Sequence, residues 1–166
     1  MNSTVTLLPK RLLLVDDQAD VRDVLRAHLE PEGYEIFEAA DGSEAIPLAR
    51  ELQPDLIIVD IYMPTLNGIS LCQRLRQFPE LAETPILLVT GFASEEILQQ
   101  ALAAGASDYL TKPISWPLLH HRLRQLLLLT EAKAACAKSE QRWEHLAKDF
   151  PGLIYRTTAD PKRTFR

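Results

Sequence analysis

Cysteine is scarce in this chain of 166 residues: only Cys72 and Cys136 occur, far apart in the sequence. A disulfide-stapled domain or a zinc site needs cysteines clustered at short spacings, so the sequence indicates neither. Each cysteine falls in a segment that we expect to be helical. We interpret both as small packing residues.

Long apolar runs are missing as well. No stretch approaches the ~18 apolar residues of a membrane span, and the start MNSTVTLLPK lacks the basic lead, apolar core and cleavage site of a secretory signal. We therefore expect a cytoplasmic protein with no membrane partner. The net charge is -5. Because phosphate backbones bind clusters of Lys and Arg, this balance argues against direct nucleic-acid binding.

Short apolar runs alternate with longer amphipathic segments along the chain. This alternation is typical of an α/β protein in which βα units build a parallel sheet. The runs LIIV and ILLV are apolar on both faces, so we expect their strands to be central, together with the first strand. YEIFEA alternates and is expected nearer an edge. We predict strands at 11–16, 34–39, 55–60, 85–90 and 107–112, and helices at about 19–30, 43–52, 67–77 and 94–104.

The pattern changes after Pro113, because neither Gly nor Pro occurs between Pro117 and Lys148. One extended helix over this stretch would be about 50 Å long at ~1.5 Å per residue. Its first half is apolar enough to pack on a sheet, and its second half is Ala-rich and mostly polar. It is therefore interpreted as a solvent-exposed tail or linker helix. The alternative is a coiled coil that would support a homodimer, with a seam of Leu119, Leu123, Leu126 and Thr130 that weakens at Lys133 and Ala137.

Polar side chains follow the predicted strands at their carboxyl ends. Asp16 and Asp17 end the first strand, and Asp60, Thr90 and Lys112 end the third, fourth and fifth. In an open parallel sheet this edge is where ligands bind. Carboxylates crowded there repel one another unless a cation neutralises them, and Mg²⁺ is the natural candidate. The alternative for the two adjacent aspartates is a cap on the following helix.

Several motifs in register resemble the receiver domain of bacterial two-component response regulators. They are Asp16-Asp17, DIYMPTLNG at 60–68, Thr90-Gly91 and Lys112-Pro113. The resemblance covers residues 10 to about 128. It implies a flavodoxin-like (βα)5 fold, doubly wound around a five-stranded parallel sheet of order 2-1-3-4-5. It also implies phosphotransfer from a histidine kinase or a phosphotransfer protein.

The resemblance assigns a role to each residue of the acidic edge. Asp60 would be the phosphoryl acceptor, a carboxylate nucleophile that forms an acyl phosphate. Asp17, with Asp16 behind it, would hold Mg²⁺ together with Asp60 and the backbone carbonyl of Tyr62. Lys112 would pair with Asp60 before transfer and with a phosphoryl oxygen afterwards. The alternatives are a strand-end aspartate that caps the next loop and an exposed turn lysine.

The resemblance also implies a conformational switch. Thr90 would swing its hydroxyl to the new phosphoryl group, and Tyr109 would rotate inward from solvent; the alternative for Tyr109 is an ordinary half-buried aromatic. The Lys112-Pro113 peptide bond would be cis. Tyr62 departs from the family by its bulk, and we expect it to alter the access of water to the acceptor. Phe92 also departs, because it is apolar where some relatives carry an acid, and the sequence does not indicate the direction of its effect.

The chain ends are expected to lie outside the receiver domain. We predict a flexible arm at 1–9, the receiver domain at 10–128 and a helical linker at 129–138. Residues 139–166 resemble the opening of a PAS sensory domain and are too few for a domain core, so they indicate a truncated start of an attached module. Such a module is the expected covalent partner of the receiver.

Two other functions compete with the receiver interpretation. A Mg²⁺-dependent phosphatase of the haloacid dehalogenase type also uses a strand-end aspartate, but it normally needs a second aspartate where Tyr62 stands. A pseudo-receiver would dock partners without phosphorylation. The intact set of acidic residues disfavours this second alternative.

Overall fold

The computed structural model describes residues 8–92 and 94–149 of the chain. Most of the predicted arm at 1–9 lies outside these residues, as does most of the PAS-like segment at 139–166. Both therefore stay predictions.

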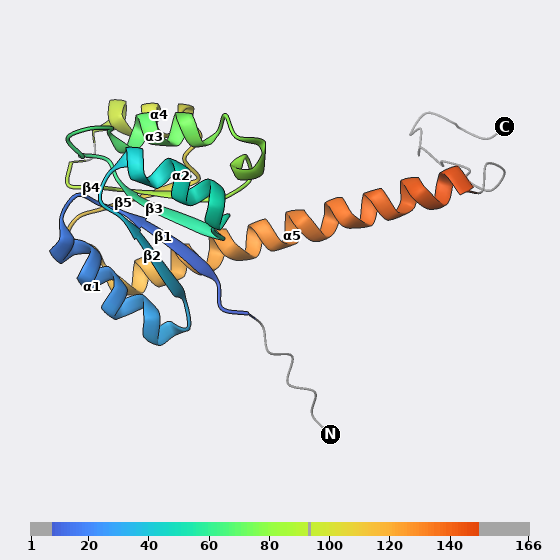
Figure 1. Cartoon of the computed structure of the whole chain (residues 1–166), viewed down its shortest axis with the longest axis horizontal. Coiled ribbons are helices and arrows are strands. Elements are labelled where there is room, and N and C mark those ends of the chain that lie inside the picture. Colours follow the sequence, from blue (N-terminus) through green and yellow to red (C-terminus); the bar gives the residue numbers. More distant parts are fainter. Residues whose placement is uncertain (1–7, 93, 150–166) are drawn as a thin grey trace, which may run out of the picture. The chain divides into compact units, whose positions relative to one another are not determined.

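The core of the fold is one parallel sheet (Figure 1). Its strand order is β2-β1-β3-β4-β5, which confirms the predicted flavodoxin-like topology and the edge position of the second strand. Every residue of β3 and β4 is buried, as their unbroken apolar runs predicted. The strands are β1 (Arg11–Val15), β2 (Glu35–Ala39), β3 (Leu56–Asp60), β4 (Ile86–Thr90) and β5 (Asp108–Thr111).

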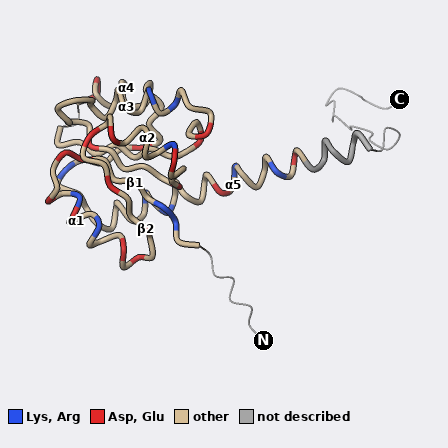
Figure 2. The backbone as a smooth tube through the Cα atoms, in the orientation of Figure 1, with Lys and Arg blue, Asp and Glu red and all other residues tan. Residues whose placement is uncertain are grey.

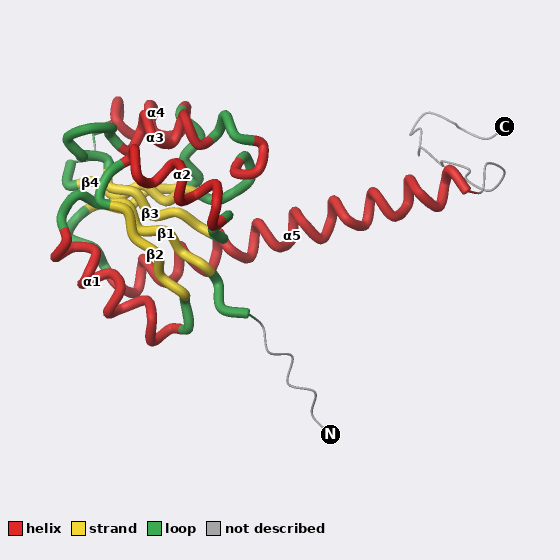
Figure 3. The backbone as a smooth tube through the Cα atoms, viewed as in Figure 1, coloured by secondary structure: helices red, strands yellow, loops and turns green. Residues whose placement is uncertain are grey.

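Helices cover both faces of this sheet (Figure 3). α2, α3 and α4 pack on one face, and α1 and the start of α5 pack on the other. β1 serves both layers, because Leu13 and Val15 point to the first and Leu12 and Leu14 to the second. The helices are α1 (Ala19–Leu29), α2 (Gly42–Leu52), α3 (Gly68–Leu75), α4 (Glu95–Ala103) and α5 (Trp116–Asp149), with short 3-10 helices η1 (Glu30–Glu32) and η2 (Pro79–Leu81).

Strand register brings the polar strand ends to one edge. Asp60 lies opposite Val89 and Thr90 opposite Thr111, one residue before Lys112. The backbone N–H of Lys112 donates to the carbonyl of Thr90 at 2.7 Å. The carboxyl ends of β3, β4 and β5 are thus level with one another.

Arg76 ties together two loops at the opposite end of the strands. Its guanidinium donates hydrogen bonds to the carbonyls of Gly105, Leu81 and Thr84 at 2.9, 2.8 and 2.7 Å. Burial lowers the pKa of this guanidinium from its usual value, yet it keeps its charge because the usual value is so high. Arg76 therefore supplies donors for carbonyl groups that lie outside the sheet ladder.

The long C-terminal helix is present, but its leucines do not form the proposed seam. Leu119, Leu123 and Leu126 are buried in the core that α5 shares with α1 and the sheet, so the coiled-coil interpretation is wrong for these residues. The contacts divide the chain into two units, one up to Thr130 and one from Glu131 onward. Among the described residues, no helix is long and apolar enough to cross a membrane.

The two cysteines differ in their surroundings. Cys72 is buried in α3, as expected, and burial raises the pKa of its thiol to about 11. Cys136 is exposed, so its interpretation as a packing residue is wrong. Lys and Arg are interspersed with Asp and Glu along the backbone rather than gathered on one element (Figure 2). The absence of direct nucleic-acid binding stays a prediction.

Candidate functional site

Asp60 and Lys112 form an ion pair at the carboxyl edge of the sheet. Lys112 Nζ lies 2.8 Å from Asp60 Oδ1, and the Asp60 side chain is only 4% exposed. The other carboxylate oxygen of Asp60 accepts a hydrogen bond from the backbone N–H of Tyr62 at 3.1 Å. The Lys112-Pro113 peptide bond is cis, as expected. Lys112 is therefore not an exposed turn lysine. The Asp60 carboxylate also caps the loop that follows its own strand, which was the alternative interpretation of this residue.

Asp16 completes the charged group from the neighbouring strand. Its carboxylate is buried, and Oδ2 lies 3.3 Å from Lys112 Nζ. Oδ1 accepts from the backbone N–H of Gln18 at 2.9 Å. The N-cap of α1 is Gln18 and has no side-chain cap, so the helix-cap alternative for Asp16 and Asp17 is wrong. One ammonium is thus shared between two buried carboxylates, while Asp17 is exposed beside them.

The charges at this edge shift one another's titration. Burial raises the pKa of the Asp60 carboxyl above its usual value, and the Lys112 hydrogen bond and charge offset only part of that shift. Burial alone would lower the pKa of Lys112, but its hydrogen bond to Asp60 and the charges of Asp16 and Asp60 outweigh burial and raise it. Lys112 is therefore charged at neutral pH, and the buried surroundings of Asp60 disfavour the ionised form of its carboxyl.

The oxygen atoms at this edge suit a hard cation. Asp17 is exposed, Asp60 is the last residue of β3, and the Tyr62 backbone follows two residues later and bonds the Asp60 carboxylate. Within the described part of the chain, no three His, Cys, Asp or Glu side chains are gathered closely enough to hold a metal ion by themselves. Mg²⁺ usually keeps several waters and binds through one or two carboxylates, so an oxygen-only set of this kind fits it. The ligand set itself stays a prediction.

Gly68 lets α3 begin directly against the end of β3, at Asp60. A Cβ atom at this position would overlap the Asp60 carbonyl oxygen and press on Ile61 Cα. The Gly68 N–H donates to the Ile61 carbonyl at 3.0 Å, which closes the β3–α3 loop. Any residue with a side chain would force this loop away from Asp60.

The side chains of the two predicted switch residues, Thr90 and Tyr109, form no hydrogen bond with Asp60 or Lys112 within the described part of the chain, although the Thr90 carbonyl accepts from the Lys112 N–H. The buried Thr90 hydroxyl donates to the Phe92 carbonyl at 2.8 Å and accepts from the Phe92 N–H at 3.1 Å. Tyr109 is half-buried and packs against the core between the sheet and α4. Both residues have partners in their present positions, so a switch would have to break these contacts.

Aromatic rings follow the ends of β3, which carries Asp60, and of the neighbouring strand β4. Tyr62 is 51% exposed and Phe92 66% exposed. A Cβ atom at Gly91 would meet nothing within 4 Å, so there is open space beside this residue.

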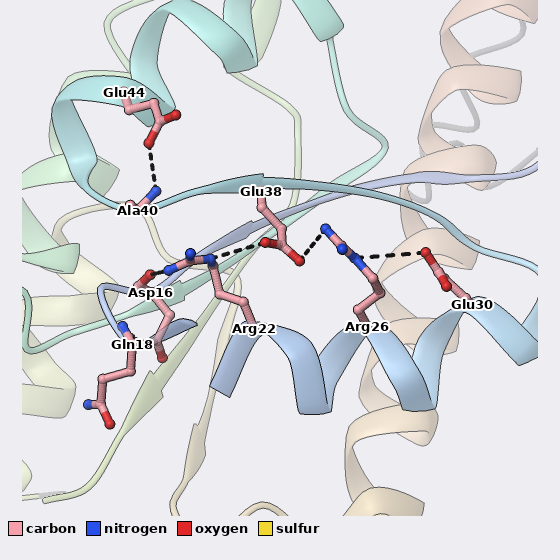
Figure 4. A network of polar contacts seen from close by, with 8 residues as sticks. All are labelled: Asp16, Gln18, Arg22, Arg26, Glu30, Glu38, Ala40 and Glu44. Atoms are coloured by element: carbon pink, nitrogen blue, oxygen red, sulfur yellow. Dashed lines mark hydrogen bonds and ion pairs between the residues drawn. The ribbon is translucent and has the colours of Figure 1, made fainter. Parts of the chain in front are cut away.

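The sequence did not predict a polar network that links Glu38 and two arginines of α1 to the backbone at Asp16 (Figure 4). Arg22 of α1 donates from Nη1 to the Asp16 backbone carbonyl at 2.6 Å and from Nε to Glu38 Oε2 at 3.2 Å. Arg26 pairs with Glu38 Oε1 at 2.5 Å and with Glu30 at 3.8 Å. The signal in the sequence was weak: two acidic residues, Glu35 and Glu38, within the predicted edge strand, and two arginines four residues apart on the preceding helix.

Comparison with known proteins places this geometry in a family. The chain matches the response regulator receiver domain over residues 12–124. It is 37% identical over 131 residues to the DNA-binding dual master transcriptional regulator RpaA of Synechocystis sp., which covers 79% of this chain and 54% of RpaA. The chain therefore spans about half the length of that regulator.

Solved structures give the same result. The chemotaxis protein CheY4 of Vibrio cholerae is 34% identical, with a TM-score of 0.69 over 71% of this chain and 98% of that one. The receiver domain of the sensor histidine kinase PA1611 from Pseudomonas aeruginosa PAO1 is 30% identical, with a TM-score of 0.67 over 72% and 98%. That structure has a magnesium ion coordinated in its active site cleft.

Proposed function

The chain belongs to the response regulator receiver domain family, and we propose that it accepts a phosphoryl group on Asp60 from a phosphohistidine. The observation that carries this proposal is the 2.8 Å pair of Lys112 and Asp60 beside the buried Asp16. A buried carboxylate at the ligand-binding edge of a parallel sheet, with a fixed cation against it, suits attack on an anionic phosphorus centre.

The reaction is a displacement at phosphorus. An oxygen of the ionised Asp60 carboxylate forms the new P–O bond as the P–N bond to the donor imidazole breaks, and the imidazole leaves with that electron pair. Asp17, Asp60 and the Tyr62 carbonyl would hold Mg²⁺, with Asp16 behind them. When bound, the ion supplies charge that stabilises the phosphoryl oxygens. Lys112 exchanges its contact with Asp60 for one with a phosphoryl oxygen.

The phosphoryl group would act on the rest of the domain through Thr90. To reach the new oxygens, its hydroxyl must leave both hydrogen bonds to Phe92. Tyr109 packs on the same side of the sheet as α4 and would reorient as that space opens. The phosphoryl group favours this second arrangement by its additional contacts, which is a population shift.

The partners follow from this chemistry. A histidine kinase or phosphotransfer protein would supply the group in the cytoplasm, and a downstream domain in the same protein would respond to it. We place the receiver at 10–128 and a helical linker at 129–138, followed by a PAS-like segment. A homodimer through α5 would have to use residues other than Leu119, Leu123 and Leu126, since these fill the core.

Two small phosphoryl donors separate this function from its alternatives. With Mg²⁺ and phosphoramidate, which has a P–N bond, we expect one protein-bound phosphoryl group per chain. With p-nitrophenyl phosphate we expect no sustained release of p-nitrophenol. Continuous release would identify a phosphatase instead, and failure of both reactions would identify a docking module.

A further inference from the structure

Glu38 carries a charge on the inner face of the edge strand β2. Residues alternate along a strand, and Ile36, two residues earlier, packs in the core on the α1 side of the sheet. Glu38 therefore points toward α1, where its side chain is 19% exposed and that of its partner Arg22 is 15% exposed. A charge buried to this extent needs close partners, and α1 supplies both arginines (Figure 4).

Arg22 does more than neutralise Glu38. Its Nη1 donates a 2.6 Å hydrogen bond to the carbonyl of Asp16, which belongs to the peptide unit joining Asp16 to Asp17. A charged donor makes a stronger bond than a neutral one. This bond fixes the plane of that peptide and hence the direction in which the Asp17 side chain leaves the backbone.

The other contacts of this loop hold Asp16 rather than the following peptide. The Asp16 N–H donates to the Ala39 carbonyl at 3.3 Å, and the Asp16 carboxylate binds the Gln18 N–H and Lys112. These contacts fix the start of the loop and one side chain. Arg22 adds the constraint on the carbonyl between the two acidic residues.

Glu38 also explains why an arginine is tolerated so close to a cation site. A free guanidinium beside Asp16 and Asp17 would compete with an incoming cation for their charge. Glu38 Oε2 lies 3.2 Å from Arg22 Nε, so the charge of Arg22 is already balanced. Arg26, at 2.5 Å from Oε1, holds Glu38 from the other side.

We propose that Arg22 is a positioning residue for cation binding: anchored by Glu38, it holds the Asp16–Asp17 peptide so that Asp17 faces the acceptor site. The proposal rests on the function proposed above, because the cation that Asp17 would hold is the Mg²⁺ of phosphotransfer. Residues one contact removed from a metal ligand typically change metal affinity by about 10 to 100-fold when they are replaced.

Arg26 offers a matched control for Arg22. Both arginines lie on α1 and pair with Glu38, but the Arg26 contacts are with Glu38 and Glu30, and Arg22 alone of the two bonds the Asp16 carbonyl. Arg22→Met and Arg26→Met therefore each remove a guanidinium from Glu38. Arg22→Lys keeps the charge but lacks the planar guanidinium that places Nε against Glu38 and Nη1 against the Asp16 carbonyl.

The test uses ¹⁵N NMR of the full chain, first without metal and then in a Mg²⁺ titration. In metal-free Arg22→Met we expect the Gln18 amide to exchange with solvent at least tenfold faster than in the parent. In the titration we expect its Kd for Mg²⁺ to rise about tenfold or more. Arg22→Lys should fall between the parent and Arg22→Met, and Arg26→Met should stay within about twofold of the parent in both measurements.

Equal effects of Arg22→Met and Arg26→Met would overturn the proposal, because a general loss of the α1–β2 ion pairs would then explain them. Parent-like exchange and Kd in Arg22→Met would overturn it as well. If Asp60 of the parent takes up no phosphoryl group, the proposed function fails. The metal-free comparison of Gln18 exchange still supports or overturns the positioning role in that case.

Discussion

Replacing Lys112 by methionine removes the one ammonium that two buried carboxylates share, while the apolar stem is largely kept. At an effective dielectric constant of about 20, charges 2.8 Å apart attract by about 6 kcal/mol. Most of this attraction only offsets the burial of the ions. Removal of one partner from a buried pair costs about 3–5 kcal/mol, and Lys112 is 26% exposed, so water screens part of the loss. We therefore expect Lys112→Met to lower the free energy of unfolding by about 2 kcal/mol at pH 7.

The penalty should depend on pH in a defined direction. Burial raises the pKa of Asp60, and Lys112 opposes that shift. Without Lys112 the folded-state pKa rises further above the unfolded value. The penalty therefore begins as pH rises above the unfolded-state pKa, where the unfolded carboxyl ionises, and is complete once pH has passed the raised folded-state pKa. It disappears below the usual carboxyl range, where both states are protonated.

Urea unfolding followed by circular dichroism at pH 7.5 and pH 4.5 measures this effect without metal. The penalty of Lys112→Met should be smaller at the lower pH. It should also shrink when Asp60→Asn is introduced in the same chain, since the charge left unpaired is then gone. A penalty that is independent of pH and unchanged by Asp60→Asn would refute the electrostatic reasoning and leave only lost packing.

Three further changes test other parts of the account. Gly68→Ala places a Cβ against the Asp60 carbonyl and should cost about 1–3 kcal/mol in urea unfolding, whereas Gly91→Ala, which meets open space, should change stability by less than about 0.5 kcal/mol. Arg76→Met leaves carbonyls without donors and should cost about 2–4 kcal/mol; a loss no larger than that of exposed Arg74→Met would contradict this. Tyr62→Asn should speed loss of the phosphoryl group, measured as the decay of labelled protein, and an unchanged rate would show that the ring does not screen water.

The sheet could be predicted because its physical signals are local. LIIV and ILLV are apolar on both faces, and only strands covered by two helical layers bury such runs. The residues after those strands then meet at one edge without further information, which is why the Asp60 and Lys112 pairing could be expected. The parallel ladders between β3, β4 and β5 fix the strand register and bring the ends of these strands level with one another.

The C-terminal helix shows where spacing alone is ambiguous. Leu119, Leu123 and Leu126 repeat at intervals of 4 and 3, which suits both a coiled-coil seam and a helix face packed on a sheet. The structure uses them for the core. Cys136 is a similar case, because its helix could be recognised while the exposure of that part of the helix could not.

The Arg22 network was not predictable because it depends on which way an edge strand faces. From the sequence alone, Glu38 would be assigned to the polar, solvent-facing side of a half-exposed strand. In the structure it lies on the α1 face, and two arginines balance it. The partner of the Thr90 hydroxyl was hidden for a similar reason, since it is a backbone group of its own loop at Phe92.

The central claim is that the Asp60 carboxylate, held against Lys112, is the phosphoryl acceptor. Intact mass spectrometry after incubation with acetyl phosphate tests it most directly, with and without Mg²⁺, on the parent chain and on Asp60→Asn. We predict a gain of one phosphoryl group in the parent with Mg²⁺ and no gain in Asp60→Asn. An unmodified parent, or equal modification of Asp60→Asn, would contradict the account.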